Sequence, residues 1–284
     1  PLSADRFELR RCPQCALVYV SPRPSQERMR VYYPDGYFGK RHPVLKNFFM
    51  GLRVRTLPRA VKGRVLDIGC GRGDFLMACR QDGWDVAGVE QSGTPIMEMR
   101  RSLQLDVGTT EELDSRPDAS FDVVTMWHVF EHMVDPRAML RRSFRLLRPG
   151  GVLVVEVPNF GSWQARLGPA TWFHLDVPRH VIHFDRATLT TMLEAEGFAA
   201  ESWSTFSAEY DAFGMMQSVL NRISPTPNWL FQKLIGQGGR TRAGDVAATV
   251  LLAPVLSVLS LVISAIAPVF GQGGVLRVTA RKNA

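Results

Sequence analysis

The sequence predicts an α/β fold in which helices cover a mostly parallel β-sheet. Three observations support this fold class. From Arg64 onward, short apolar runs alternate with segments of helical periodicity, a glycine-rich turn joins the first run to the first helix, and no repeat or low-complexity tract is evident. With 45% apolar and 21% charged residues, the 284-residue chain has the composition of a globular protein. We therefore expect βαβ units with right-handed crossovers.

The expected strands are short, apolar and bounded by turn residues. They are Val65–Ile68, Asp85–Glu90, Phe121–Met126, Gly151–Val157, Ala199–Thr205 and Val275–Arg281. The helices between them follow the 3.6-residue apolar period. They are Asp74–Gln81, Thr94–Ser102, Pro136–Leu147 and Asp185–Glu196. These elements predict one α/β domain made of residues 64–206 and 274–284.

Residues 1–63 are expected to form an N-terminal cap that ends in a basic helix, Val44–Val61. Residues 1–64 hold 14 Lys and Arg against 4 Asp and Glu, a charge of +10, whereas the other 220 residues carry −3. This asymmetry favours an anionic partner, either a membrane surface or a nucleic acid. A basic face that is merely solvated is the alternative.

The four cysteines are Cys12, Cys15, Cys70 and Cys79. They are too few for a disulfide scaffold in so long a chain, so we expect a reducing, cytoplasmic compartment. The Cys12–Cys15 spacing is that of one knuckle of a zinc ribbon, which needs two such pairs. Either residues upstream of Pro1 complete the site or the knuckle holds no metal, and we predict no metal ligands in this chain.

An apolar insertion is expected at residues 207–273. It contains Ala247–Phe270, 24 mostly apolar residues, within a stretch without charge from residue 246 to 276. This length could span a bilayer, but the last strand returns the chain to the sheet, so both ends lie on one side. The segment could be a shallow re-entrant or interfacial hairpin broken near Pro254 or Pro268, or a helix pair buried in the protein or in a dimer. We expect membrane contact and leave the oligomeric state open.

The most specific signal is the turn after the first strand, where glycines stand at positions 69, 71 and 73. Glycine allows a sharp turn and a close approach of the backbone to a ligand. In open α/β sheets such ligands bind at the carboxyl ends of the strands. Asp67 within the first strand suits an amino-bearing ligand, and Glu90 at the end of the second can hold a ribose diol.

These residues resemble class I S-adenosylmethionine-dependent methyltransferases. Val65–Gly73 looks like motif I of that family, Glu90 matches its ribose-binding acid, and Phe121–His132 looks like its fourth strand and the loop after it. Arg148–Gly151 is similar to the turn before strand five. The likeness is greatest to the branch that contains the ubiquinone-type O-methyltransferases. It implies a Rossmann-like sheet of seven strands, mostly parallel, with the last strand antiparallel.

By this resemblance S-adenosylmethionine is the cofactor, with Glu111 or Glu112 near its adenine. The residues implied to bind it are Asp67, Gly69, Cys70, Gly71, Glu90, Gln91, Glu111, Trp127 and His128.

Methyl transfer to an oxygen also requires a base with a pKa near 7, which points to histidine. One histidine cluster, with Glu131, follows the fourth strand, and a second lies at residues 174–183. The catalytic candidates are His128, Glu131, His132 and His180. Glu131 and His132 could instead bind a divalent ion, but the sequence offers no recognisable third ligand.

The sequence favours O-methylation of a hydrophobic, small or lipid-like acceptor at the inner face of the membrane. A sugar or sugar-nucleotide methyltransferase and a non-catalytic methyltransferase-like scaffold are the alternatives. Nucleic acid is not an expected partner, because Trp127–Phe130 stands where base-amino methyltransferases carry an Asn/Asp-Pro-Pro-aromatic tetrad.

Overall fold

The computed structural model describes residues 6–33, 43–58, 62–91, 93–236 and 241–283. A seven-stranded sheet in the order β5-β4-β3-β6-β7-β10-β9 forms its centre. Its strands are β3 (Arg64–Ile68), β4 (Asp85–Glu90), β5 (Asp106–Thr109), β6 (Phe121–Trp127), β7 (Leu147–Pro158), β9 (Phe198–Ser204) and β10 (Val275–Lys282). Neighbouring strands from β5 to β7 are parallel, and β10 is antiparallel to both β7 and β9. The predicted seven-stranded sheet with an antiparallel last strand is confirmed.

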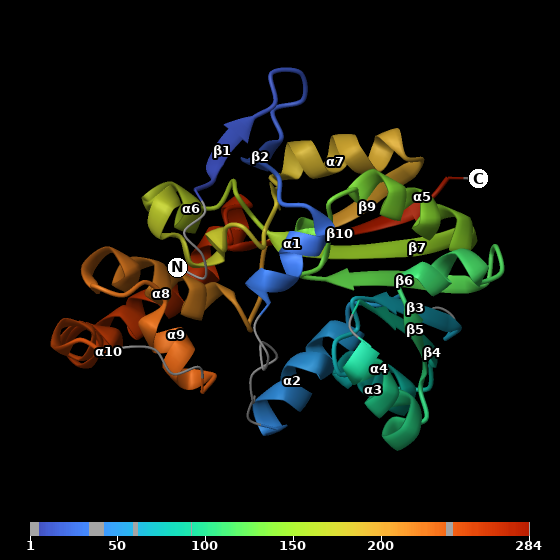
Figure 1. Cartoon of the computed structure of the whole chain (residues 1–284), viewed down its shortest axis with the longest axis horizontal. Helices are drawn as coiled ribbons and strands as arrows, with labels where there is room; N and C mark the ends of the chain where they lie inside the picture. Colours follow the sequence, from blue (N-terminus) through green and yellow to red (C-terminus); the bar gives the residue numbers. More distant parts are fainter. Residues whose placement is uncertain (1–5, 34–42, 59–61, 92, 237–240, 284) are drawn as a thin grey trace.

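Helices cover both faces of this sheet. Figure 1 shows α5 (Pro136–Leu146) and α7 (Arg186–Ala195) on one face, and α2 (Pro43–Val54), α3 (Asp74–Gln81) and α4 (Gly93–Glu98) on the other. Asp185 caps α7, since its side chain accepts the Thr188 N–H at 2.8 Å. Because helices lie on both faces, the inner strands are apolar throughout rather than alternating, as Leu66, Val124 and Val154 illustrate at 0% exposure.

Several elements differ from their predicted bounds. Strand β5 is only four residues long and includes Gly108, so it lacks a clear apolar run. The helix expected over Thr94–Ser102 is α4 followed by a π-helical turn, Met99–Leu103. The basic helix ends at Val54 rather than Val61, and residues 59–61 lie outside the described part of the chain.

A second, three-stranded sheet joins the N-terminal segment to the rest of the fold. Its strands are β1 (Glu8–Arg11), β2 (Val18–Ser21) and β8 (Ile182–His183), with β2 in the middle. The Cys12–Cys15 pair lies in the turn between β1 and β2, and both cysteines are free. The short helices α1 (Gln26–Met29) and α6 (Trp163–Leu167) complete the regular structure before the insertion.

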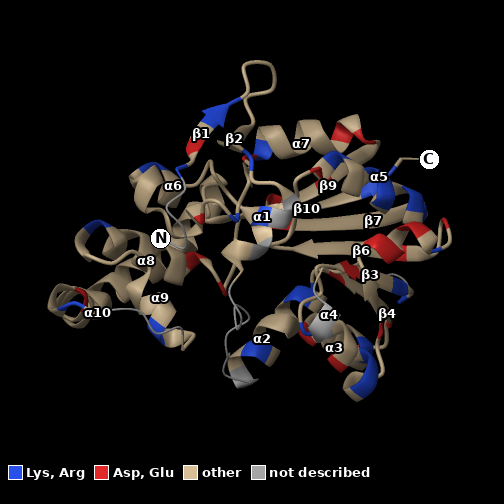
Figure 2. Cartoon of the chain, viewed as in Figure 1, with Lys and Arg blue, Asp and Glu red and all other residues tan. Residues whose placement is uncertain are grey.

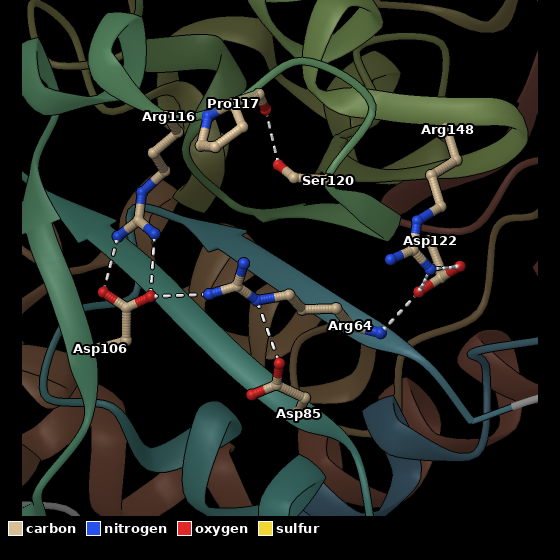
Figure 3. Close-up of polar contacts among 8 residues, drawn as sticks. All are labelled: Arg64, Asp85, Asp106, Arg116, Pro117, Ser120, Asp122 and Arg148. Atoms are coloured by element: carbon tan, nitrogen blue, oxygen red, sulfur yellow. Dashed lines mark hydrogen bonds and ion pairs between the residues drawn. The ribbon is translucent and has the colours of Figure 1, made fainter.

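An ion-pair network ties together the amino ends of four strands. Arg64 at the start of β3 pairs with Asp85 and Asp106, at 3.1 Å each, and its backbone N–H donates to Asp122 (Figure 3). Arg116 pairs with Asp106 from the opposite side at 2.9 Å. Parallel strands have all their amino ends at one edge of the sheet. These ion pairs therefore link the strands at the edge opposite the glycine loop.

The predicted insertion is helical. It comprises α8 (Asp211–Ile223), α9 (Trp229–Leu234) and α10 (Ala243–Ile266), followed by a 3₁₀ turn, Ala267–Phe270. Of the arrangements left open for this segment, a hairpin broken near Pro254 is wrong, because one continuous helix passes through Pro254; that helix ends at Ile266, just before Pro268. Helix α10 packs along α8 and then leads into β10, so the chain does return to the sheet.

Candidate active site

The glycine loop after β3 depends on backbone conformations that other residues rarely adopt. Gly69, Gly71 and Gly73 have φ angles of +76°, +57° and +80°. A Cβ atom on Gly69 would lie 2.4 Å from Cγ2 of Val129, so the close approach of the next loop also requires glycine there. The chain turns through these residues into α3, which leaves the loop backbone at the carboxyl edge of the sheet.

Two carboxylates lie at this loop. Asp67 is 3% exposed, and its Oδ1 accepts a hydrogen bond from Thr125 Oγ1 at 2.7 Å. Burial raises the pKa of Asp67 to about 7, against the opposing effects of Thr125 and Arg53. Glu90 spans the loop, because its carboxylate accepts the Gly71 N–H at 2.8 Å and the Gln91 N–H at 2.7 Å.

The other predicted cofactor residues lie along the same edge. Cys70 is buried, and its N–H donates to the Val89 carbonyl at 3.1 Å, which fixes the loop against β4. Trp127 ends β6, with its ring 5.3 Å from that of Phe75. Glu111 is exposed in the 3₁₀ turn that follows β5.

Sequence reasoning missed Arg53 as a site residue. This α2 residue lies over the Trp127 ring at 5.2 Å and pairs with Glu209 of the insertion at 2.9 Å. Its charge acts on the buried carboxylates Asp67 and Glu156, whose pKa values it lowers. No sequence signal separates Arg53 from its basic neighbours, because only the packing of α2 brings it to the site.

His128 lies among acidic side chains and is mostly buried. It follows β6 with a φ of +53°, and its ring nitrogens lie 3.4 Å from Glu131 Oε1 and 3.3 Å from Glu156 Oε1. Burial alone would lower the pKa of His128, but contact with the two carboxylates raises it well above its ordinary value. The Tyr210 ring packs against it at 4.3 Å. A histidine that keeps its proton is unsuited to act as the base.

Glu156 was also missed, although a lone acid in the apolar run Gly151–Val157 is a detectable signal. It lies opposite Arg277 of β10 in the strand register and pairs with it at 3.1 Å. Burial would raise the pKa of Glu156, but His128, Arg53 and Arg277 lower it to about 2. Glu156 is therefore ionised and holds His128 in its charged form.

The pKa of His180 is shifted in the opposite direction from that of His128. Its Nδ1–H donates to the His174 carbonyl at 2.7 Å, which leaves Nε2 to face Glu131 Oε1 at 3.9 Å. Burial, with the charges of His132 and His183, lowers the pKa of His180 well below its ordinary value. Its Nε2 lone pair is therefore available at neutral pH.

The structure brings together all four predicted catalytic residues, because His128 Nδ1 lies 3.4 Å from Glu131 Oε1 and Glu131 also groups with His132 and His180. The Val181 N–H donates to the Glu131 carbonyl at 3.0 Å, and the imidazole rings of His132 and His180 lie 4.6 Å apart. One ligand atom from each of Glu131, His132 and His180 lies within 4.8 Å of the others, so the trio could hold a divalent ion. His180 is thus the third ligand that the sequence did not reveal.

Comparison with known proteins identifies the family of the chain. Residues 43–202 match the family described as Methyltransferase domain. A probable S-adenosylmethionine-dependent methyltransferase of Mycolicibacterium smegmatis is 31% identical over 193 residues, which is 66% of this chain and 70% of that protein. The chain belongs to the methyltransferase family. It is also 35% identical to the ubiquinone biosynthesis O-methyltransferase of Pseudomonas aeruginosa over 34% of this chain, an alignment that spans only 44% of that relative.

A solved structure supports the fold of this methyltransferase. The S-adenosylmethionine-dependent methyltransferase of Archaeoglobus fulgidus has a TM-score of 0.52 and 22% identity, and the alignment covers 83% of this chain and 94% of that one. The match to the family and the similarity to the Mycolicibacterium smegmatis relative show that the protein is an S-adenosylmethionine-dependent methyltransferase. The cofactor carries an ammonium group, a ribose diol and a sulfonium, and the buried acid Asp67, the Glu90 carboxylate and the open glycine loop fit these groups chemically.

Proposed function

We propose that this methyltransferase O-methylates a hydrophobic phenol-like or lipid-like acceptor, with His180 as the base. The observation that carries the proposal is the orientation of the His180 imidazole. Its Nδ1 is fixed by a backbone carbonyl, and its Nε2 lies beside the buried carboxylate of Glu131. A base oriented in this way, with an acid beside it, is suited to take the proton of a hydroxyl group.

Each side chain has a distinct role in this proposal. When bound, S-adenosylmethionine supplies an activated methyl group. Asp67 and Glu90 hold its ammonium and ribose, and Arg53 lies over Trp127 to bind its carboxylate. The acceptor hydroxyl gives its proton to His180 Nε2, and Glu131 stabilises the resulting imidazolium. The rest of the acceleration comes from alignment of the two reactants.

Two observations support a hydrophobic acceptor. Aromatic rings border the histidine site. The ring centroid of Phe173 lies 4.9 Å from that of His174, and the ring centroid of Tyr210 lies 4.3 Å from that of His128. The Pseudomonas aeruginosa relative is named for ubiquinone biosynthesis. We infer that the enzyme works in the cytoplasm, at the inner face of the membrane.

The test is methylation of a bacterial lipid extract, a phenolic quinol precursor and a panel of sugar nucleotides with deuterated S-adenosylmethionine. Mass spectrometry should find the label on oxygen in a hydrophobic molecule. Label confined to sugar nucleotides or to nitrogen would refute the acceptor class. A Gly71→Leu variant, in which a side chain fills the loop, should give no label in any fraction.

A further inference from the structure

Helix α10 carries its large apolar side chains on the outside. Its buried side chains are small or polar, namely Asp245, Ala248, Ser260 and Ser264. Its exposed apolar side chains are Val246, Val250, Leu251, Val255, Val258, Leu259, Leu261, Val262 and Ile266. Leu251 is 72% exposed, and Val269 in the following turn is 80% exposed. A helix of a water-soluble protein normally shows the reverse arrangement.

The segment Ala243–Phe270 is long and apolar enough to cross a bilayer. Its most apolar 18-residue window has a mean hydropathy of 2.6, yet only 17% of that window is buried. Both of its ends join the same body, because α9 precedes it and β10 follows it in the central sheet. Figure 2 shows charges gathered on other parts of the molecule and few on α8–α10. This geometry suits a helix that lies in the membrane interface rather than one that spans it.

An apolar groove opens beside this helix. A cavity of about 400 Å³ lies between α6, α8 and α10, lined by Trp163, Arg166, Leu167, Met215 and Ile263. Leu167 is 51% exposed, and the Trp163 ring stacks on Phe270 at 5.8 Å, so the groove is continuous with the outer face of α10. Arg166 is the one charged residue of this lining and is exposed. Among the described residues it has no ion-pair partner.

We propose that the outer face of α10 docks on an anionic lipid bilayer, with an acyl chain in the groove and a lipid phosphate at Arg166. Charge favours this occupant over a second copy of the chain. In a dimer the guanidinium of Arg166 would be covered by another apolar face without a counterion, whereas a bilayer supplies phosphates at that depth. An apolar helix with one cationic rim residue matches an anionic amphiphile.

This inference rests on the proposed function and deepens it, because it places the acceptor in the lipid phase. Tyr210 directly precedes α8 and contacts His128, and Met215, five residues later, lines the groove. Five helical residues rise about 7.5 Å. Along the axis of α8, the groove residue Met215 is therefore about one and a half turns from the residue that contacts His128.

The experiment is co-sedimentation of the full chain with phosphatidylcholine vesicles, with and without 30% phosphatidylglycerol. Binding should be stronger to the anionic vesicles and should weaken with salt without vanishing. The double variant Leu251→Glu, Leu259→Glu should lose at least tenfold in binding. Arg166→Gln should lose only the preference for anionic vesicles. Val31→Glu, an equally exposed apolar site outside the insertion at 65%, is the matched control and should bind as wild type.

Calorimetry with S-adenosylmethionine checks that each variant is folded. If the double variant fails this check, Val269→Asp replaces it. Wild-type protein that ignores both vesicle types would overturn the proposal. So would a dimer in analytical ultracentrifugation that the same α10 substitutions dissociate. Failure of the acceptor assignment is distinguishable, because vesicle binding and cofactor binding are then intact while no hydrophobic molecule becomes methylated.

Discussion

At the level of single residues, the surroundings of two histidines in the site give them different pKa values. His128 lies between two buried carboxylates and keeps its proton, whereas His180 has one nitrogen fixed by a carbonyl and remains neutral. Their pKa values therefore move in opposite directions from the same ordinary value. Such a divergence is typical of sites that use one group as a fixed charge and another as a proton acceptor. The sequence identified both residues but could not assign these roles.

Replacing His180 tests the base assignment. His180→Ala should lower kcat by ~10²–10⁴, the usual scale of general-base catalysis, and leave the affinity for S-adenosylmethionine unchanged. Steady-state kinetics with calorimetry of cofactor binding measures both. His128→Gln is the comparison, because it removes a cation rather than a base and should not shift the acidic limb of the pH–rate profile. Near-full activity of His180→Ala would mean that positioning alone drives transfer.

The ionisation of Asp67 should control cofactor affinity. Its pKa of about 7 means that the acid is half protonated near neutral pH, and only the ionised form attracts the ammonium of S-adenosylmethionine. Affinity should fall by up to about tenfold per pH unit as the pH drops below 7. Calorimetry from pH 5.5 to 8.5 measures this change. Asp67→Asn should bind more weakly and without that slope, and an equal slope in the variant would exclude Asp67 as its origin.

At the level of elements, two loops form the catalytic cluster. The turn Phe130–His132 follows β6, and the segment before β8 supplies His180. Antiparallel pairing of β8 with β2 and the Val181–Glu131 backbone bond fix this segment in place. The glycine loop was predictable because its chemistry is local to a few residues. The approach of His180 to Glu131 was not, because it depends on pairing between segments far apart in the sequence.

The orientation of helix α10 was likewise not predictable from the sequence. Its composition predicted an apolar helical segment, but its orientation contradicts the general rule that large apolar side chains face inward. Ser260 and Ser264 pack inward because small side chains allow a close approach, as at helix interfaces in membranes. The sequence alone could not show which side of α10 faces α8.

Chelation tests whether the Glu131, His132 and His180 trio works as a metal site. We expect activity to survive dialysis against EDTA, because the Nε2 atom of His180 is needed for the acceptor proton and cannot also bind a metal ion. Elemental analysis of the purified protein accompanies the assay. Activity that is lost on dialysis and restored by Mn²⁺ or Zn²⁺ would show instead that the trio binds a metal.

At the level of the whole molecule, buried titratable groups make stability depend on pH in two opposing ways. Burial raises the pKa of both Asp67 and Asp211 to about 7, so the native state holds two protons that the unfolded chain releases near pH 4. Their contribution to stability is complete below pH 4 and is lost as the pH rises through 7.

Buried histidines have the opposite effect on the pH dependence of stability. Burial lowers the pKa of His174 to about 3 and that of His183 to about 4, and the pKa of His180 is also low. Their contribution to stability is complete above pH 6.5 and is lost as the pH falls. His128, with a raised pKa, favours the native state at low pH and loses that contribution as the pH rises.

Together these pKa shifts predict that the free energy of unfolding is greatest near pH 6. Near pH 5 the unfolded state binds about one proton more than the native state, three from histidines against two held by the acids. The unfolding free energy should therefore rise with pH there by ~1.4 kcal/mol per pH unit, and less steeply toward pH 6. Above pH 6.5 the free energy of unfolding should fall, because the native state then holds protons on the two acids and on His128 that the unfolded chain has released. Denaturation by urea from pH 5 to 9 measures the curve. The Asp67→Asn, Asp211→Asn double variant should steepen the acidic slope about threefold, and a wild-type stability that rises steadily to pH 9 would contradict the assigned protonation states.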